Sequence, residues 1–196
     1  MLKKYFAISL SFFATSLISA FFSFNAAAAP IVYEGDLTDG TTQTGDMQVD
    51  SLNTPEFWDF WTITANVGDS ITIIANRLMA DVDPILAVWS GTETDTSEYA
   101  SLFSDSTNTT HIDFGDDEIS NPGPFGDPQV DFVAATAGTY TIAIAEHTAG
   151  DDTICAQGCG YDITATIVSE VPEPAPLALL GLGLIGLGAL RIRKSQ

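Results

Sequence analysis

The stretch from Phe57 to Ala65, FWDFWTITA, decides the fold prediction. Aromatic and β-branched residues fill most of its positions, and such residues favour a pleated strand. Successive side chains of a strand point to opposite faces, so one face carries Phe57, Trp61, Ile63 and Ala65. The other face carries Trp58, Phe60, Thr62 and Thr64. The first face is the more apolar, and we expect it to pack against the core.

Five further segments have the same character, and Gly, Pro, Asn or Asp residues bound each of them. They are 69–75 (DSITIIA), 85–89 (ILAVW), 129–134, 139–146 (TYTIAIAE) and 161–169 (YDITATIVS). Helix signals are confined to a turn or two within 94–103. The pattern predicts an all-β fold with one domain over 29–170, a single antiparallel β-sandwich.

The order of these segments resembles the pre-peptidase C-terminal domains of bacteria. The matching motifs are Asp59-x-Trp61-x-Ile63, Asp83-Pro84-Ile85-Leu86, the acidic pair Asp116-Asp117, Asp127-Pro128, and Gly138-Thr139-Tyr140. The resemblance covers about residues 57–147 and implies a jelly-roll-like sandwich with an acidic, metal-binding loop. The chain departs from that family at Pro122-Gly123-Pro124, where a plain glycine run is usual.

The acidic loop is a candidate calcium site. The stretch 111–132 holds Asp131 and five candidate ligands, Asp113, Asp116, Asp117, Glu118 and Asp127. Calcium takes roughly six to eight oxygen ligands in flexible geometry, and Asp81 and Asp83 precede a neighbouring strand. The EF-hand spacing is absent, and the alternative is a solvated acidic loop that keeps the protein soluble. Calcium is the one cofactor that the sequence suggests.

The body of the chain is strongly acidic. Of the 26 acidic residues only Glu173 lies outside 29–170, which leaves 25 carboxylates, and Arg77 is the one basic residue there, for a net charge of 25 − 1, or −24. Such a field repels nucleic acid and anionic lipid, and it attracts cations.

No catalytic motif stands out, and we expect no enzyme and no catalytic residues. The two histidines, His111 and His147, lie in no nucleophile elbow or zinc-protease motif. Acid pairs such as Asp81 with Asp83 arise by chance among so many carboxylates. A secreted hydrolase would need one such pair to face a cleft.

Trp58 and Phe60 raise the alternative of a carbohydrate-binding module. If both lie exposed on the second face of their strand, their rings can stack on sugars. The competing interpretation is packing in the core, where aromatic residues dominate the interior of a sandwich.

Cys155 and Cys159 are separated by three residues in a glycine-containing loop. In an oxidising compartment a disulfide between them is the expected state. A redox or metal-binding pair is the alternative, although redox motifs usually have the C-x-x-C spacing.

The N-terminus has the three parts of a signal peptide. Lys3 and Lys4 precede an uncharged apolar run from Tyr5 to Phe24, and an alanine run at 26–29 supplies the small residues of a cleavage site. We expect residues 1–28 to be removed by signal peptidase; an uncleaved anchor is the alternative.

The C-terminal stretch 171–196 contains Gly181, Gly183 and Gly186, which have the G-x-G-x-x-G spacing of nucleotide loops. The context excludes that function, because prolines precede the glycines and no acidic residue follows them. Residues 175–190 instead form an uncharged apolar segment followed by basic residues at 191–194. The segment predicts a short single transmembrane helix of about 24 Å with its basic end in the cytoplasm.

Pro172-Glu173-Pro174, the apolar segment and the basic end together resemble the PEP-CTERM sorting tail of Gram-negative bacteria. The resemblance implies that exosortase recognises Pro172, Glu173 and Pro174, removes the tail and releases the body. We therefore expect transient anchoring in the inner membrane and then a cell-surface or extracellular location. The function expected is a non-enzymatic structural or binding role in the biofilm matrix, with exopolysaccharide as a candidate partner.

Overall fold

The computed structural model describes residues 29–48, 54–147 and 158–169. The predicted signal peptide, Cys155 of the predicted disulfide, and the predicted helix over 175–190 lie outside these residues, so they remain predictions. Among the residues described, no helix is long and apolar enough to cross a membrane.

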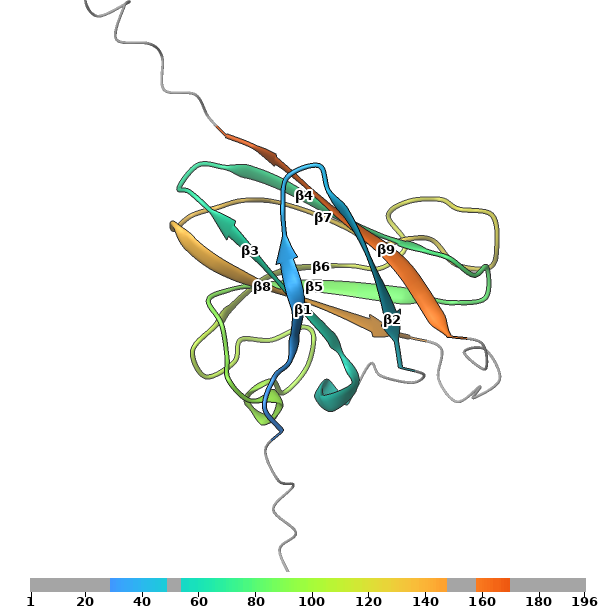
Figure 1. The fold of residues 1–196 in the computed structure, drawn as a ribbon, viewed down its shortest axis with the longest axis horizontal. Helices are drawn as coiled ribbons and strands as arrows, with labels where there is room; N and C mark the ends of the chain where they lie inside the picture. Colours follow the sequence, from blue (N-terminus) through green and yellow to red (C-terminus); the bar gives the residue numbers. More distant parts are fainter. Residues whose placement is uncertain (1–28, 49–53, 148–157, 170–196) are drawn as a thin grey trace, which may run out of the picture.

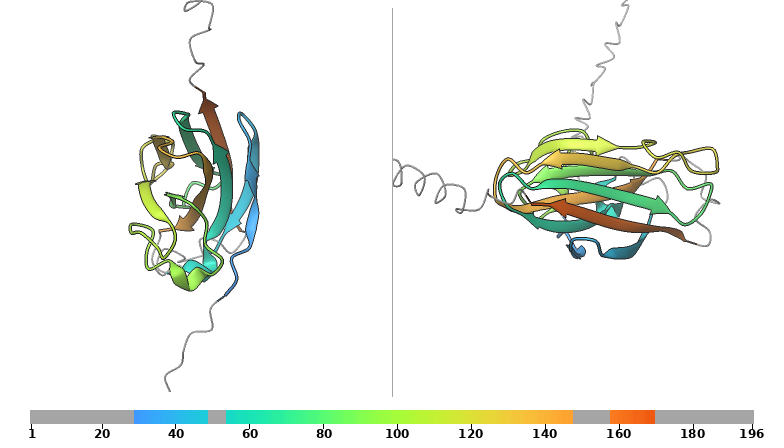
Figure 2. Two further views of the ribbon diagram at one scale, coloured as in Figure 1. Left: turned by 90° about the vertical axis from the view of Figure 1, so that its left-hand side faces the viewer. Right: turned by 90° about the horizontal axis from the view of Figure 1, so that it is seen from above.

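The described strands form two sheets (Figure 1). The five-stranded sheet has the order β1 (Tyr33–Leu37), β3 (Asp59–Ala65), β8 (Gly138–Glu146), β5 (Pro84–Ser90), β6 (Thr110–Gly115). The four-stranded sheet has the order β2 (Thr42–Met47), β9 (Cys159–Val168), β4 (Ser70–Arg77), β7 (Gln129–Val133). The two sheets lie face to face as a sandwich (Figure 2).

The predicted all-β class is confirmed, with two differences. The strands β1, β2 and β6 were not expected, and β1 pairs with β3 in parallel, so the sandwich is not wholly antiparallel. Within 94–103 the helical signal becomes only the 3-10 turn η2 (Thr96–Glu98); a second 3-10 turn, η1 (Pro55–Phe57), precedes β3.

The main core lies between the two sheets. Trp61, Ile63 and Ala65 of β3 are buried there against the isoleucines of β4, β8 and β9. The predicted inner face of this strand is therefore confirmed from Trp61 onward. Phe57 departs from it, because it belongs to η1 and is 47% exposed.

A second core covers the outer face of the five-stranded sheet. Trp58, Phe60 and Trp89 project there and are covered by Tyr99 and Leu102 of the segment 91–109. β5 is buried along nearly its whole length because it faces the main core on one side and this second core on the other.

Candidate metal site

Three neighbouring strands of the five-stranded sheet each supply one side chain to a common point. Asp83 directly precedes β5, His147 directly follows β8, and Asp116 directly follows β6. Because β5 lies between β8 and β6 and runs antiparallel to both, its first residue lies beside their last ones. One ligand atom from each side chain lies within 4.8 Å of the others.

Hydrogen bonds hold Asp83 and His147 together. The His147 backbone amide donates to the Asp83 carbonyl at 2.8 Å. The His147 Nδ1 atom lies 3.2 Å from Asp83 Oδ2, while the side chain of Asp83 is 6% exposed and that of His147 is 47% exposed. The carboxylate therefore lies inside the protein, and the imidazole connects it to solvent.

Two carboxylate oxygens of this cluster are buried without a hydrogen-bond partner. They are Asp83 Oδ1 and Asp116 Oδ1. A buried oxygen that has lost water and gained no donor costs roughly 1–3 kcal/mol, and more when it is charged. A bound cation would supply the missing partner for both oxygens.

The pKa values of the two carboxyl groups agree with this geometry. Desolvation raises the pKa of Asp83, and the hydrogen bond and positive charge of His147 oppose the rise. Desolvation also raises the pKa of Asp116, and the negative charges of Asp83 and Asp117 add to it. The cluster concentrates negative charge where water is scarce, so a proton or a metal ion is favoured there.

The donor set is two carboxylates and one imidazole. Imidazole suits zinc, copper, iron and nickel, whereas calcium is bound through oxygen ligands. The cluster can therefore hold a divalent transition-metal ion, with the remaining coordination positions open to water or another ligand.

Of the five predicted calcium ligands, the structure brings only Asp116 into this cluster. The other four accept hydrogen bonds that shape the acidic loop: Asp113 from Phe114 N, Asp117 from Gly126 N, Glu118 from the amides of Asp116 and Gln129, and Asp127 from Asn121. Asp81 and Asp83 were both expected to approach this loop. Asp83 belongs to the cluster, whereas Asp81 is exposed and lies outside it.

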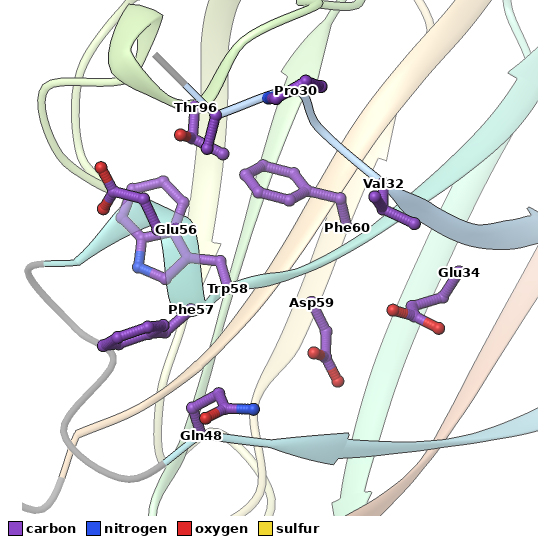
Figure 3. A pocket seen from close by; sticks show the side chains of 11 residues that line it. Pro30, Val32, Glu34, Gln48, Glu56, Phe57, Trp58, Asp59, Phe60 and Thr96 are labelled. Carbon is purple, nitrogen blue, oxygen red and sulfur yellow. The ribbon is translucent and has the colours of Figure 1, made fainter. Parts of the chain in front are cut away.

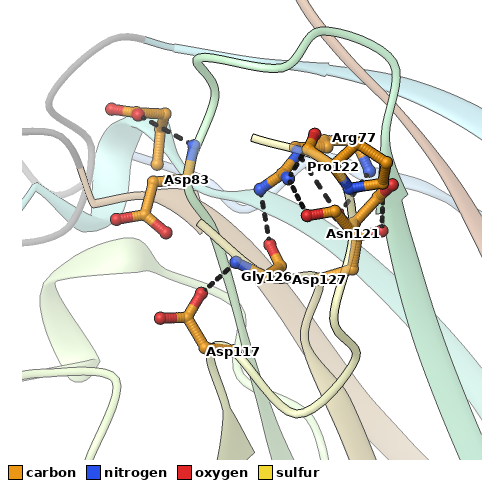
Figure 4. A network of polar contacts seen from close by, with 8 residues as sticks. Arg77, Asp83, Asp117, Asn121, Pro122, Gly126 and Asp127 are labelled. Carbon is orange, nitrogen blue, oxygen red and sulfur yellow. Dashed lines mark hydrogen bonds and ion pairs between the residues drawn. The ribbon is translucent and has the colours of Figure 1, made fainter. Parts of the chain in front are cut away.

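Arg77 holds the loop that contains Pro122-Gly123-Pro124. The buried guanidinium donates to the carbonyls of Gly126 at 2.8 Å, Pro122 at 3.3 Å and Asn121 at 3.4 Å (Figure 4). Its Nε atom lies 3.7 Å from Asp127 Oδ1. Asp127 therefore neutralises an arginine and is not a free metal ligand.

Sequence reasoning placed His147 at a strand end but gave it no role. The signal that could have found it has two parts: a histidine directly after one strand, and an aspartate directly before a second strand that pairs with the first. Reading that signal requires the pairing of β5 with β8, which separates the two residues by 64 positions in the chain.

The predicted ligand-stacking residues Trp58 and Phe60 are buried, at 5% and 2% exposure. Neither presents a full ring face to solvent, which removes the basis on which stacking was expected. His111 is half-buried, with its ring edge-on to Trp89 at 5.6 Å.

Comparison with known proteins identifies the tail. Residues 170–194 match the PEP-CTERM protein-sorting motif. The motif implies an exported protein that is anchored in the membrane, processed by exosortase and then released. No curated protein sequence matches the chain.

Solved structures with a similar fold include three bacterial proteins. CorA of Methylomicrobium album BG8, a surface-associated copper-binding protein, has a TM-score of 0.50 at 12% identity, covering 69% of this chain and 98% of that one. The copper-binding secreted protein MopE of Methylococcus capsulatus has a TM-score of 0.46 at 11% identity, covering 67% and 86%. The pre-peptidase C-terminal domain of a Bacillus anthracis collagenase has a TM-score of 0.43 at 12% identity, covering 70% and 100%. At these identities the likeness concerns the fold alone.

Proposed function

We propose that this protein is an exported, exosortase-sorted surface or matrix protein that binds a divalent transition-metal ion through Asp83, Asp116 and His147. Its role is binding and not catalysis. The observation that carries the proposal is the meeting of one imidazole with two carboxylates, Asp83 buried and Asp116 half-buried, and with a buried, unpartnered oxygen on each carboxylate.

Copper(II) is the first ion to test. For a given set of nitrogen and oxygen ligands, affinity among divalent first-row ions rises to a maximum at copper. The fold is also similar to that of CorA, which is described as a copper-binding surface protein. Calcium, the ion expected from the acidic loop, fits this donor set less well because one ligand is nitrogen.

The position of the cluster suits a protein held by its C-terminus. At the end of β9, Val168 pairs with Ser70 of β4, and Ser70 also pairs with Val133 of β7. β8 begins at Gly138, five residues after Val133, so the end of β9 and the start of β8 lie at the same end of the sandwich. His147 lies beyond the other end of β8, so the cluster and the end of β9 lie at opposite ends of the sandwich (Figure 1).

Titration calorimetry of the metal-free mature protein tests the binding. We expect one equivalent of Cu²⁺ to bind, Zn²⁺ to bind more weakly, and Ca²⁺ to bind weakest. Asp116→Asn and His147→Gln should each weaken copper binding at least about tenfold, the loss of one charge-assisted contact. Asp113→Asn removes an exposed carboxylate three residues from Asp116 and serves as the matched control. A preference for calcium, or unchanged copper affinity in both site variants, would overturn the assignment.

Intact-mass spectrometry of protein from its native host tests the sorting. We expect a chain that begins near Ala29 and ends near Pro174. Recovery of a chain that still carries residues 191–196 would contradict processing of the tail.

A further inference from the structure

The end of the sandwich opposite the metal cluster carries three exposed valines. Val133 of β7 and Val168 of β9 both pair with Ser70 of β4, so they lie on either side of it in one row of the four-stranded sheet. Their side chains are 63% and 62% exposed. Val67 lies in the turn between β3 and β4, three residues before Ser70, and is 67% exposed. This end therefore presents apolar side chains to its surroundings.

Three turns build this end, and hydrogen bonds hold them in place. They are 38–41, 66–69 and 134–137. The Gly68 amide donates to the Ala134 carbonyl at 2.9 Å, and the Ala134 amide donates to the Asp69 carbonyl at 2.9 Å. The Gly40 amide donates to the carbonyl of Ala165 in β9, also at 2.9 Å. The end is therefore a preformed surface.

Charge is scarce at this end. The three turns hold only two acidic residues, Asp39 and Asp69, and no basic one. The Ile167 amide donates to the Asp39 carboxylate at 2.8 Å, and the Asn66 amide donates to the buried Asp69 carboxylate at 2.7 Å. Asp131 of β7 accepts hydrogen bonds from two neighbouring side chains. The opposite end, where β5 begins and β6 ends, is far more acidic and carries Asp81, Asp83, Asp116, Asp117 and Glu118.

An uncharged recess opens beside Val133 and extends the apolar surface. Its volume is about 250 Å³, and its lining includes Ile112, Val133 and Tyr140. None of the described residues that line it is charged. The recess lies between β6 and β7, at the edge where the two sheets come together.

The chain that leads to the sorting tail leaves from this end. β9 ends at Val168, and the predicted membrane segment begins at Ala175 (Figure 1). Seven residue steps span at most about 25 Å even when the chain is fully extended. While the tail is in the membrane, this end of the body is therefore held within that distance of the bilayer.

The tether makes a small apolar contact sufficient. Linking two partners turns their contact into an intramolecular one, with an effective concentration that reaches the millimolar range for short linkers. Three valines would not hold a free body on a membrane, and the acidic remainder of the surface is repelled by anionic lipid. The contact should therefore last only as long as the tail is attached.

We propose that this valine-bearing end rests on the lipid bilayer while the tail anchors the protein, and that it leaves the bilayer when the tail is removed. Val67, Val133 and Val168 contact the lipid, and the uncharged recess lies beside them. The proposal rests on the proposed sorting, because the tail must first hold the body at the membrane.

Lipids that carry a nitroxide on the headgroup report which part of the anchored protein approaches the bilayer. The ¹⁵N-labelled chain from Ala29 to Gln196 is inserted into phosphatidylcholine nanodiscs with and without the labelled lipid. We expect the amide resonances of residues 66–68 and 134–137 to broaden most, and those of Asp83 and Asp116 to stay sharp. A body that ends at Pro174 should show no such broadening, because it lacks the tether.

Variants separate a lipid contact from mere proximity. Val67→Asp with Val133→Asp places two charges on this end and should remove the extra broadening of residues 66–68 and 134–137. Leu78→Asp is the matched control, because Leu78 is 55% exposed and directly follows the other end of β4. Melting curves confirm that both variants are folded. Unchanged broadening in the double variant, or an equal loss in Leu78→Asp, would overturn the proposal.

Flotation with phosphatidylcholine vesicles distinguishes this inference from the sorting on which it rests. A chain that does not float with the vesicles contradicts anchoring, and the docking with it. A chain that floats without the expected broadening contradicts the docking alone. If the double variant keeps the broadening but loses removal of its tail in the native host, this end contacts exosortase and the lipid proposal is wrong.

Discussion

Arg77 is the one arginine or lysine between residues 29 and 170, and the fold uses it inside the protein. Its guanidinium neutralises Asp127 and satisfies three carbonyls of the acidic loop. The planar, forked donor geometry of arginine suits this set of acceptors, and an ammonium group could not reproduce it. The side chain therefore holds the loop that carries Asp116.

Replacing Arg77 should be strongly destabilising. Arg77→Met leaves Asp127 as an uncompensated buried charge, and we expect the free energy of unfolding to fall by about 3–5 kcal/mol. Arg77→Lys should recover part of that loss. Urea denaturation measures both variants, and a change below about 1 kcal/mol for Arg77→Met would show that the network does not stabilise the fold.

At the scale of single residues, the sequence could predict acidic residues near strand ends but not which of them stay free to bind a metal ion. Asp116 and Asp127 look alike in the sequence, since both lie in one acidic loop. Only the fold shows that Asp127 pairs with Arg77 while one oxygen of Asp116 stays without a partner. The difference depends on a contact across 50 residues, which no local pattern contains.

The segment 91–109 is the element that turns an open sheet face into a second core. Trp89 Nε1 donates to the Ser104 carbonyl at 2.8 Å, and Tyr99 packs on the Trp89 ring at 4.9 Å. Glu93 fastens the base of the segment by accepting hydrogen bonds from Ser106 and Asn108. η2, which lies in this segment, contributes Thr96 to the lining of a pocket beside the start of β3 (Figure 3).

Leu102 tests how firmly this segment is packed. The side chain is fully buried in the second core, so Leu102→Ala should lower the free energy of unfolding by about 2–5 kcal/mol. Limited proteolysis should then cleave within 91–109 sooner than in the parent protein. Thr107→Ala, at an exposed position of the same segment, should change stability by less than about 0.5 kcal/mol. Similar effects of the two substitutions would contradict the second core.

The alternation in 57–65 predicted the strand and its inner face, but not that its outer face is covered as well. That cover comes from a segment whose own sequence has weak secondary-structure preference, so only tertiary packing reveals it. The strands β1 (YEGDL) and β2 (TQTGDM) were missed because each is short, polar and at the edge of its sheet. Edge strands bury little, and their hydrophobic pattern is correspondingly faint.

Over the whole molecule, the predicted net charge of −24 for the exported body should make stability depend on pH. Burial raises the pKa of Asp59 to about 6 and raises those of Asp83 and Asp116. The folded state then binds the protons of these carboxyl groups more tightly than the unfolded state does. Stability therefore falls as pH rises from the unfolded pKa of 3.8 through the raised pKa values, which for Asp59 means through about pH 6. Self-repulsion acts in the same direction.

At lower pH, other carboxyl groups have the opposite effect and make stability rise as pH rises. The Asn66 backbone amide lowers the pKa of Asp69, and Thr72 lowers that of Asp131. Burial would raise the pKa of Glu93, but hydrogen bonds from Glu98, Ser106 and Asn108 lower it to about 2. These depressed values stabilise the fold above the unfolded pKa values, and that stability is lost as pH falls through the folded ones.

The carboxyl groups with raised pKa values and those with lowered pKa values together predict a stability maximum below neutral pH. In the presence of a chelator, the melting temperature should be highest between about pH 4.5 and 6 and should fall toward both pH 8 and pH 3. Calorimetric melts across this range measure it. A melting temperature that rises steadily from pH 5 to pH 8 would contradict the raised pKa values of the buried carboxyls.

The central claim is that β5, β6 and β8 together build a transition-metal site. The most direct measurement is a crystal of the mature protein grown with one equivalent of Cu²⁺, with anomalous diffraction recorded on both sides of the copper edge. We predict one strong anomalous peak about 2 Å from the His147 imidazole and from a carboxylate oxygen of each of Asp83 and Asp116, and no peak there in a crystal of Asp83→Asn with Asp116→Asn. A copper peak elsewhere on the acidic surface, with this cluster empty, would contradict the account.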